Sequence, residues 1–282
     1  MWKSSTSLWK YRTPTLETVK EDPVDLNNSY REYYMKNWSY LIVLPVIAII
    51  VLAGCTSTSQ HNQLTPQEKA RGWVLAFDGQ SFDGWRGINR NEMPPGHWVV
   101  EDGCIKKVPN SEVPEGSSGG DILIDRTFTN FEFSLDWKIS EHGNSGIKYN
   151  VSEEMSGGHG ALGFEYQIID DAGHPGVSLE EINTTGCLYA LLPPENPDEK
   201  VLHPVGEWNS SRILVNGTHG EHWLNGKKLL EFEIDSPELN ALIEKSKYSK
   251  TPNFGDKRTG YIVLQDHSTA AWYRNIKYRI IE

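Results

Sequence analysis

The chain has 282 residues, of which 38% are hydrophobic and 11% aromatic, and its formal net charge is −11. This length suffices for one large core, because all-β domains of about 200–250 residues commonly fold as a single unit. The acidic balance and the lack of a dense basic patch argue against a nucleic-acid partner. Ten Trp and twelve Tyr against four Met favour a β-rich or sugar-handling protein over a helical bundle.

The start of the chain divides into a polar segment and an apolar one. Residues 1–34 are polar and aperiodic, and Met35 resembles a natural start, so we expect 1–34 to be an upstream extension or a mis-assigned start. After a lysine, an apolar run over 41–53 leads to the letters LAGC, which end at Cys55. The run is short for a membrane span, which needs about 20 residues, and a proline interrupts it. This favours a cleaved export signal over the alternative, an uncleaved membrane anchor.

The LAGC ending resembles the lipobox of bacterial lipoproteins, in which the cysteine carries lipid and becomes the mature N-terminus. We therefore expect a lipoprotein signal peptide over 35–54 and lipidation at Cys55. The polar residues 55–64 are expected to be a flexible tether. The expected location is the bacterial cell envelope, lipid-anchored. A threonine rather than an aspartate follows the cysteine, which favours the outer membrane, with the domain on its periplasmic or surface face.

The domain over 65–282 is predicted to begin with a short helix and to continue as strands. Thr65-Pro66-Gln67-Glu68 supplies an N-cap, a proline at the first helical position and a capping-box glutamate. Over 131–139 apolar and polar residues alternate, which predicts a strand with one face in the core. Similar runs predict strands at 73–77, 97–100, 121–125, 145–151, 163–169, 186–191, 211–216, 219–224, 227–234, 260–265 and 271–281.

A hairpin signal and a second helix signal complete the pattern. Asn225-Gly226 between two strand-like runs is typical of a tight β-hairpin. Ser236, followed by a proline, caps a helix whose apolar stripe extends to about Lys247. Many short strands with few helices predict an all-β fold, a jelly-roll β-sandwich with one or two short flanking helices. The strand order does not follow from these patterns.

One predicted strand carries chemically capable side chains. In GFEYQIIDDAG, residues 163–173, the apolar Phe164, Tyr166 and Ile168 share one face of a period-2 pattern. Glu165 and Gln167 share the other face. A carboxylate and an amide side by side on a strand fit either a solvated edge or the floor of a cleft.

Seven stretches in order along 70–282 resemble the 3-keto-disaccharide hydrolase family, formerly a domain of unknown function. The resemblance implies a concanavalin-like jelly roll with a sugar cleft on its concave sheet. It also implies hydrolytic or eliminative cleavage of glycosides that are oxidised to a ketone at C3. The stretches are LAFDGQSFDGWRG (75–87), NSGIKY (144–149), FEYQIIDDAGHPG (164–176), TGCLYALLPP (185–194), GEWNSSRI (206–213), HWLNGKKLLEFEI (222–234) and GYIVLQDHSTAAWYRNI (260–276).

Such a reaction assigns roles to three side chains. A ketone at C3 acidifies the C2 proton, so a base can remove it and expel the C1 substituent, after which water adds to the double bond. The site needs a base, a group that stabilises the enolate oxygen and an acid for the leaving oxygen. Glu165, on a rigid strand, is the candidate base. Lys148 supplies a cation for the enolate, and His174 can act as acid or base near neutral pH.

Six further residues are candidates for substrate contacts, with alternatives open for two of them. Asp170 suits a turn cap as well as a sugar contact. Arg274 lies in phase with Trp272, Ile276 and Tyr278, and an arginine on an apolar strand face needs a buried carboxylate or a ligand. The full set of expected substrate-binding residues is Asn144, Gln167, Asp170, Gln265, His267 and Arg274.

Other functions remain open at this stage. Glu165, Asp170 and His174 have the residue types of divalent-metal ligands, but no tight pair such as His-x-His is present, so no cofactor is required. EYQIID spaces its acids much like those of an ordinary retaining jelly-roll glycosidase, although Gln167 takes the middle position. A carbohydrate-binding lipoprotein without catalysis is the third alternative. The expected partners are a glycoside and a membrane lipid; the oligomeric state stays open.

Overall fold

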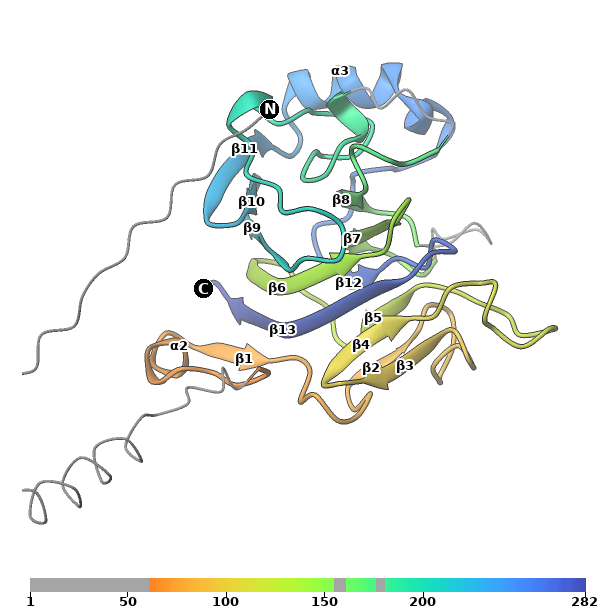
Figure 1. The fold of residues 1–282 in the computed structure, drawn as a ribbon. Coiled ribbons are helices and arrows are strands. Elements are labelled where there is room, and N and C mark those ends of the chain that lie inside the picture. The colour runs from red at the N-terminus through yellow and green to blue at the C-terminus, as the bar shows by residue number, and fades with distance from the viewer. Residues whose placement is uncertain (1–60, 155–160, 176–180) are drawn as a thin grey trace, which may run out of the picture. The chain divides into compact units, whose positions relative to one another are not determined.

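The structure is a computed structural model that describes residues 61–154, 161–175 and 181–282 (Figure 1). The expected signal peptide, the lipidation site Cys55 and most of the expected tether lie outside the described residues. Within the described ranges, no helix combines the length and the apolar character that crossing a membrane requires.

Two antiparallel sheets form the domain (Figure 1), which confirms the predicted all-β jelly roll. The eight-stranded sheet has the order β11 (Lys227–Glu233), β10 (His219–Leu224), β9 (Asn209–Asn216), β6 (Phe131–Ile139), β13 (Ala271–Ile280), β4 (Cys104–Lys107) and β3 (Trp98–Glu101), and β1 (Trp73–Leu75) also pairs with β13. The five-stranded sheet has the order β2 (Trp85–Gly87), β5 (Ile122–Ile124), β12 (Tyr261–Leu264), β7 (Asn144–Val151) and β8 (Phe164–Ile169).

The predicted helices and hairpin are present. Helix α2 (Pro66–Ala70) begins at the predicted capping box, and α3 (Pro237–Lys245) is capped by Ser236. Asn225 and Gly226 both have positive φ and connect β10 to β11, as a tight hairpin requires. The remaining described helices are short 3₁₀ turns: η1 (Glu181–Asn183), η2 (Pro197–Glu199) and η3 (Lys247–Lys250).

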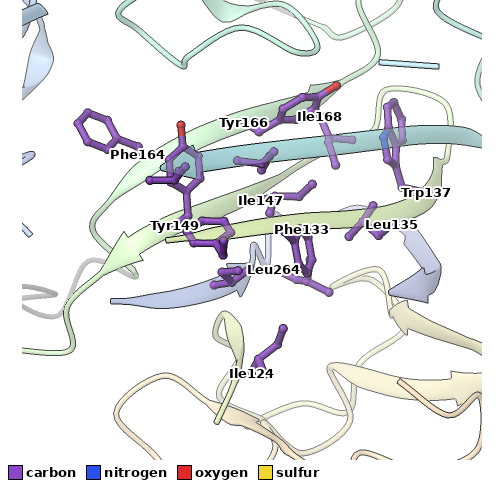
Figure 2. Close-up of a cluster of buried hydrophobic side chains, with 14 of the residues drawn as sticks. Ile124, Phe133, Leu135, Trp137, Ile147, Tyr149, Phe164, Tyr166, Ile168 and Leu264 are labelled. Atoms are coloured by element: carbon purple, nitrogen blue, oxygen red, sulfur yellow. The ribbon is translucent and has the colours of Figure 1, made fainter. Parts of the chain in front are cut away.

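The core lies between the two sheets and fixes their register (Figure 2). On β6 the alternate residues Phe133, Leu135 and Trp137 are at most 1% exposed. On β8, in the other sheet, the alternate residues Phe164 and Tyr166 belong to the same core and are equally buried. Because side chains alternate along a strand, this packing forces the polar residues of β8 onto the face that points away from the larger sheet.

The segment 186–191 is not a strand, contrary to the prediction. Its backbone instead runs along the free edge of β8: the Tyr189 amide donates to the Glu165 carbonyl (3.0 Å), and the Gly186 amide donates to the Gln167 carbonyl (2.9 Å). It satisfies edge groups that would otherwise face solvent. The short strands β2 and β4 were not predicted from the sequence.

A β-bulge in β13 overturns the predicted phase of Arg274. The pairing with β6 shifts between Arg274 and Lys277, where Asn275 has a φ of 53°. Ile276 therefore faces the core while Arg274 does not. Asn62, at the end of the expected tether, is anchored to this bulge: its amide donates to Asn275 Oδ1 (2.6 Å), and the Asn275 amide donates to Asn62 Oδ1 (2.8 Å). The ordered domain thus includes the last residues of the range expected to be flexible.

One buried histidine links the two sheets. His222 on β10 is fully buried. Its Nδ1 donates to the Gly186 carbonyl (3.0 Å), so its Nε2 accepts from the Tyr149 hydroxyl on β7 (2.8 Å). Burial lowers the pKa of His222 to about 4, because a charged imidazolium in this site would lose its hydration.

This histidine should make folding sensitive to acid. Its pKa is lower in the folded protein than in the unfolded chain, so its stabilising contribution is complete above about pH 6.5 and is lost as pH falls toward 4. We expect the urea unfolding free energy of the wild type to fall by up to about 1.4 kcal/mol per pH unit in that window. His222→Gln should flatten this slope, whereas the exposed-site control His203→Gln should keep it. Equal slopes for all three proteins would contradict the assignment.

Candidate active site

The outward faces of β7 and β8 form the floor of a polar pocket. In their antiparallel pairing Lys148 lies directly opposite Glu165, and Gly146 lies opposite Gln167. Glu165 and Gln167 are only 6% and 3% exposed, so this face is covered and is not a solvated edge. A pocket of about 250 Å³ lies over it, lined by Asn144, Lys148, Ala161, Leu162, Gly163, Glu165, Gln167, Tyr189, Lys247, Tyr248, Gln265 and His267.

Glu165 is a buried carboxylate whose oxygens are available to a ligand. Within the described residues, its carboxylate makes no hydrogen bond and no ion pair. A glycine opposite β8 provides the space, because a Cβ on Gly146 would lie 2.3 Å from Glu165 Oε1. Burial raises the pKa of Glu165, and the nearby ammonium groups of Lys148 and Lys247 oppose that rise. The carboxylate is therefore more basic than an exposed glutamate.

Lys148 is a fixed cation beside this carboxylate. Its Nζ lies 3.0 Å from Asp121 Oδ2. Burial acts to lower the pKa of Lys148, but the charges of Asp121 and Glu165 outweigh it, and the pKa is raised. Asp121 also accepts from the amides of Ala161 (3.1 Å) and Asp266 (2.8 Å). A lysine held in this way keeps its proton and serves as a permanent positive charge.

A second buried ion pair supports the loop that positions Asp121. Lys107, which is 1% exposed, lies with its Nζ 3.0 Å from Asp266 Oδ1. The other oxygen of Asp266 accepts from the Gly120 amide (3.0 Å). The residue before Asp121 and the residue after Gln265 are thereby tied together, which holds the floor and one wall of the pocket in register.

Three pocket residues with titratable side chains were missed by the sequence analysis: Tyr189, Lys247 and Tyr248. Tyr189 comes from the segment along the edge of β8, and the other two come from η3, directly after α3. The Lys247 Nζ lies 3.9 Å from the centre of the Tyr189 ring and 5.0 Å from that of Tyr248. No sequence signal identifies Lys247, because lysines near helix C-termini are common for a different reason, the helix dipole.

Most of the predicted site residues do meet in this pocket. Its floor is formed by Glu165, Lys148 and Gln167. Its other lining residues include Asn144, Gln265 and His267. Asn144 Nδ2 and His267 Nε2 lie 3.4 Å apart. The side-chain oxygens of Gln167 and Gln265 are buried and have no hydrogen-bond partner in the described part of the chain. Such atoms are suited to accept hydrogen bonds from a polar ligand.

Three predicted residues lie elsewhere. Asp170 caps a turn: its carboxylate accepts from the amides of His142 and Gly173, both at 2.9 Å. His174 follows that turn and does not line the pocket. Arg274 lies on β13 of the larger sheet, with its guanidinium 3.8 Å from the centre of the Trp208 ring and its Nε 3.7 Å from Asp136. The structure therefore brings neither the expected acid His174 nor Asp170 and Arg274 to Glu165.

The expected metal alternative is not supported at this pocket. Over 61–154, 161–175 and 181–282, Glu165, Asp170 and His174 do not form a group with converging ligand atoms. The group that does, with ligand atoms within 4.8 Å of one another, is His219, Glu221 and Glu231 on β10 and β11. Lys228 forms salt bridges with both of these glutamates, so the group is better described as a surface ion-pair network.

The chain resembles known proteins in both sequence and fold. Residues 72–279 match the family model of the 3-keto-alpha-glucoside-1,2-lyase-like domain. The 3-keto-disaccharide hydrolase of Bacteroides thetaiotaomicron is 34% identical over 236 residues, which cover 76% of this chain and 80% of that protein. A candidate glycosyl hydrolase from Parabacteroides distasonis is 36% identical, with a TM-score of 0.68 over 79% of this chain and all of that one. A second from the same organism is 25% identical, with a TM-score of 0.53 over 70% and 99%.

The jelly-roll fold, the polar pocket and these relatives define the class of the protein, a glycoside-hydrolase-like enzyme. More narrowly, the chain belongs to the 3-keto-alpha-glucoside-1,2-lyase-like family, whose model it matches over almost the whole described domain.

The pairing of Asp121 with Lys148 should be important for stability. Asp121→Ala leaves a buried ammonium and two backbone amides without their acceptor, so we expect it to cost about 3–5 kcal/mol of unfolding free energy in urea. Asp125→Ala is the matched control, because its pair with Arg86 is exposed on the aspartate side and should cost less than about 1 kcal/mol. Adding Lys148→Met to Asp121→Ala should recover part of the loss. Similar costs for the two aspartates would contradict this account.

Proposed function

We propose that the protein cleaves 3-keto-glycosides, 3-keto-disaccharides in particular, by removing the C2 proton and expelling the C1 substituent, with water then adding to give net hydrolysis. The observation that carries this proposal is Glu165: a buried carboxylate with a raised pKa and no partner in the described residues, in a pocket that also holds two lysines. The names of the family and of the Bacteroides relative point to the same substrate class.

The pocket supplies what the first step requires. Removing the C2 proton places negative charge on the C3 oxygen, and a preorganised cation in a dry site stabilises such charge far better than water does. Lys148 is suited to this role because Asp121 holds it in place and keeps it protonated. Glu165 takes the proton, and its raised pKa makes it a stronger base than an exposed carboxylate.

The remaining polar groups are suited to orient a sugar ring. The unpartnered oxygens of Gln167 and Gln265 accept hydrogen bonds, which sugar hydroxyls donate. The pocket volume of about 250 Å³ lies below the roughly 300–1,000 Å³ of sites for drug-sized ligands. It suits one sugar ring, and the second sugar of a disaccharide would extend toward the opening.

An ordinary retaining glycosidase fits the site less well. That mechanism needs a second carboxyl group about 5–5.5 Å from the first, and Glu165 is the only carboxylate among the described residues that line the pocket. Asp170, the sequence-based candidate, is occupied in its turn. A carbohydrate-binding protein without catalysis would gain nothing from burying an unpaired carboxylate, which costs stability.

The base assignment is tested by Glu165→Gln, which keeps the shape of the side chain and removes its basicity. We expect turnover of a 3-keto-disaccharide to fall by about 10²–10⁴-fold, the usual contribution of a positioned general base, with little change in affinity. In heavy water the wild type should exchange the C2 hydrogen for deuterium, and the variant should not. Glu195→Gln, an exposed carboxylate outside the pocket, is the control. Cleavage of unoxidised glycosides at an equal rate, without C2 exchange, would contradict the proposal.

We also propose that the enzyme is a lipoprotein of the cell envelope, with lipid on Cys55. The support is the apolar run over 41–53 and its LAGC ending. Mass spectrometry of the mature N-terminus should find a lipid-modified Cys55, and Cys55→Ser should leave the membrane fraction. Recovery of an intact peptide that spans Ala53–Thr56 would contradict lipid attachment.

A further inference from the structure

Lys247 brings a second, differently held cation into the pocket. Lys148 is paired with Asp121 at 3.0 Å. Lys247 has no carboxylate partner among the described residues, and its amine instead lies 3.9 Å from the centre of the Tyr189 ring. It also comes from another part of the fold. Lys247 lies on η3, directly after α3, whereas Lys148 and Glu165 lie on the neighbouring strands β7 and β8. The two lysines are therefore equipped for different tasks.

The proposed reaction leaves one role unfilled. When the C1–O bond of a disaccharide breaks, the leaving oxygen becomes a strongly basic sugar alkoxide unless it is protonated at that moment. Lys148 is unsuited, because its ion pair with Asp121 holds its proton. Desolvation lowers the pKa of Lys247, while the charge of Glu165 acts in the opposite direction. A lysine in this state gives up a proton more readily than a paired one.

The other titratable groups that face the pocket fit the role less well. Burial raises the pKa of Tyr189, and Glu165 adds to that effect, so this phenol is a poorer acid than usual. Tyr248 shares η3 with Lys247, and burial raises its pKa strongly as well. His267 is exposed and in contact with Asn144, and it is the competing candidate for the acid.

We infer that Lys247 is the general acid of the reaction, donating its proton to the C1 leaving oxygen; this rests on the proposed function. Glu165 takes the C2 proton, and the electron pair passes into the enolate at C3. When the ketone re-forms, the C1=C2 double bond forms, the C1–O bond breaks, and the leaving oxygen takes the proton of Lys247.

The second half of the cycle restores both groups. Neutral Lys247 accepts a proton from the water that attacks C1, and protonated Glu165 returns a proton to C2. The sum is a 3-keto-glycoside plus water giving the free 3-keto sugar and the released alcohol, with no oxidant or reductant consumed. The arrangement requires a cation that can lose its proton beside one that cannot, which matches the different partners of Lys247 and Lys148.

The test compares two leaving groups in the Lys247→Met variant. With a 3-keto-disaccharide, turnover should fall by about 10²–10⁴-fold, the usual contribution of a general acid. With the 4-nitrophenyl 3-keto-glucoside, whose phenolate leaves without protonation, the loss should stay below about tenfold. The C2 hydrogen should still exchange in heavy water, because Glu165 is intact. Lys250→Met, in the same 3₁₀ turn but outside the pocket, should leave both substrates unaffected.

A further variant separates proton donation from charge. Lys247→Arg keeps a positive charge, but an arginine effectively never loses its proton, so it should not restore turnover of the disaccharide. Restoration by arginine, or equal losses on the two substrates, would overturn the inference. No loss in Lys247→Met would also overturn it, and the same comparison in His267→Ala would then identify the acid. Absence of C2 exchange in the wild type would instead overturn the proposed function itself.

Discussion

The site depends on one constraint: the carboxylate of Glu165 is buried close to cations but forms no ion pair with them in the described residues. Burying an ionised group costs several kcal/mol unless charges or hydrogen bonds compensate for it. Here the compensation is indirect: Lys148 lies opposite Glu165 in the strand pairing but forms its ion pair with Asp121. The absence of a side chain at Gly146 makes room for the carboxylate, because a Cβ there would lie 2.3 Å from its Oε1. The result is a basic group that is available to a ligand.

The packing of the β-sandwich holds these polar groups in place. Its core includes residues of β6, β7 and β8 (Figure 2). This packing fixes the register in which Lys148 and Glu165 lie opposite each other. Behind the pocket, the pair of Lys107 with Asp266 supports the loop that carries Asp121. The polar groups are thus positioned by rigid strands and buried ion pairs, so little reorganisation is needed when charge develops on a substrate.

The sequence predicts those features of the site that depend on a single short segment, and it predicts less well those that depend on other parts of the fold. The alternation in FEYQII placed Glu165 and Gln167 on one face, and the structure confirms it, because both line the pocket while Phe164, Tyr166 and Ile168 lie in the core. The same reasoning failed for Arg274, because one extra residue at the Asn275 bulge reverses the phase of everything before it. For Asp170 the sequence left a turn cap and a sugar contact open, and the structure shows the turn cap, with its carboxylate accepting from nearby backbone amides.

The sequence by itself determined the all-β class, most of the strands, the hairpin at Asn225-Gly226 and the polar face of β8, because period-2 alternation and turn chemistry are properties of short segments. Only the tertiary structure decided that Asp121 would hold Lys148 and that Tyr189 and Lys247 would line the pocket. Asp121 and Tyr189 lie on loops and Lys247 lies on η3, outside the strands that form the floor, and nothing in their local sequence specifies where they dock. Their positions follow from the packing of the two sheets and of the segments that cover the edge of β8.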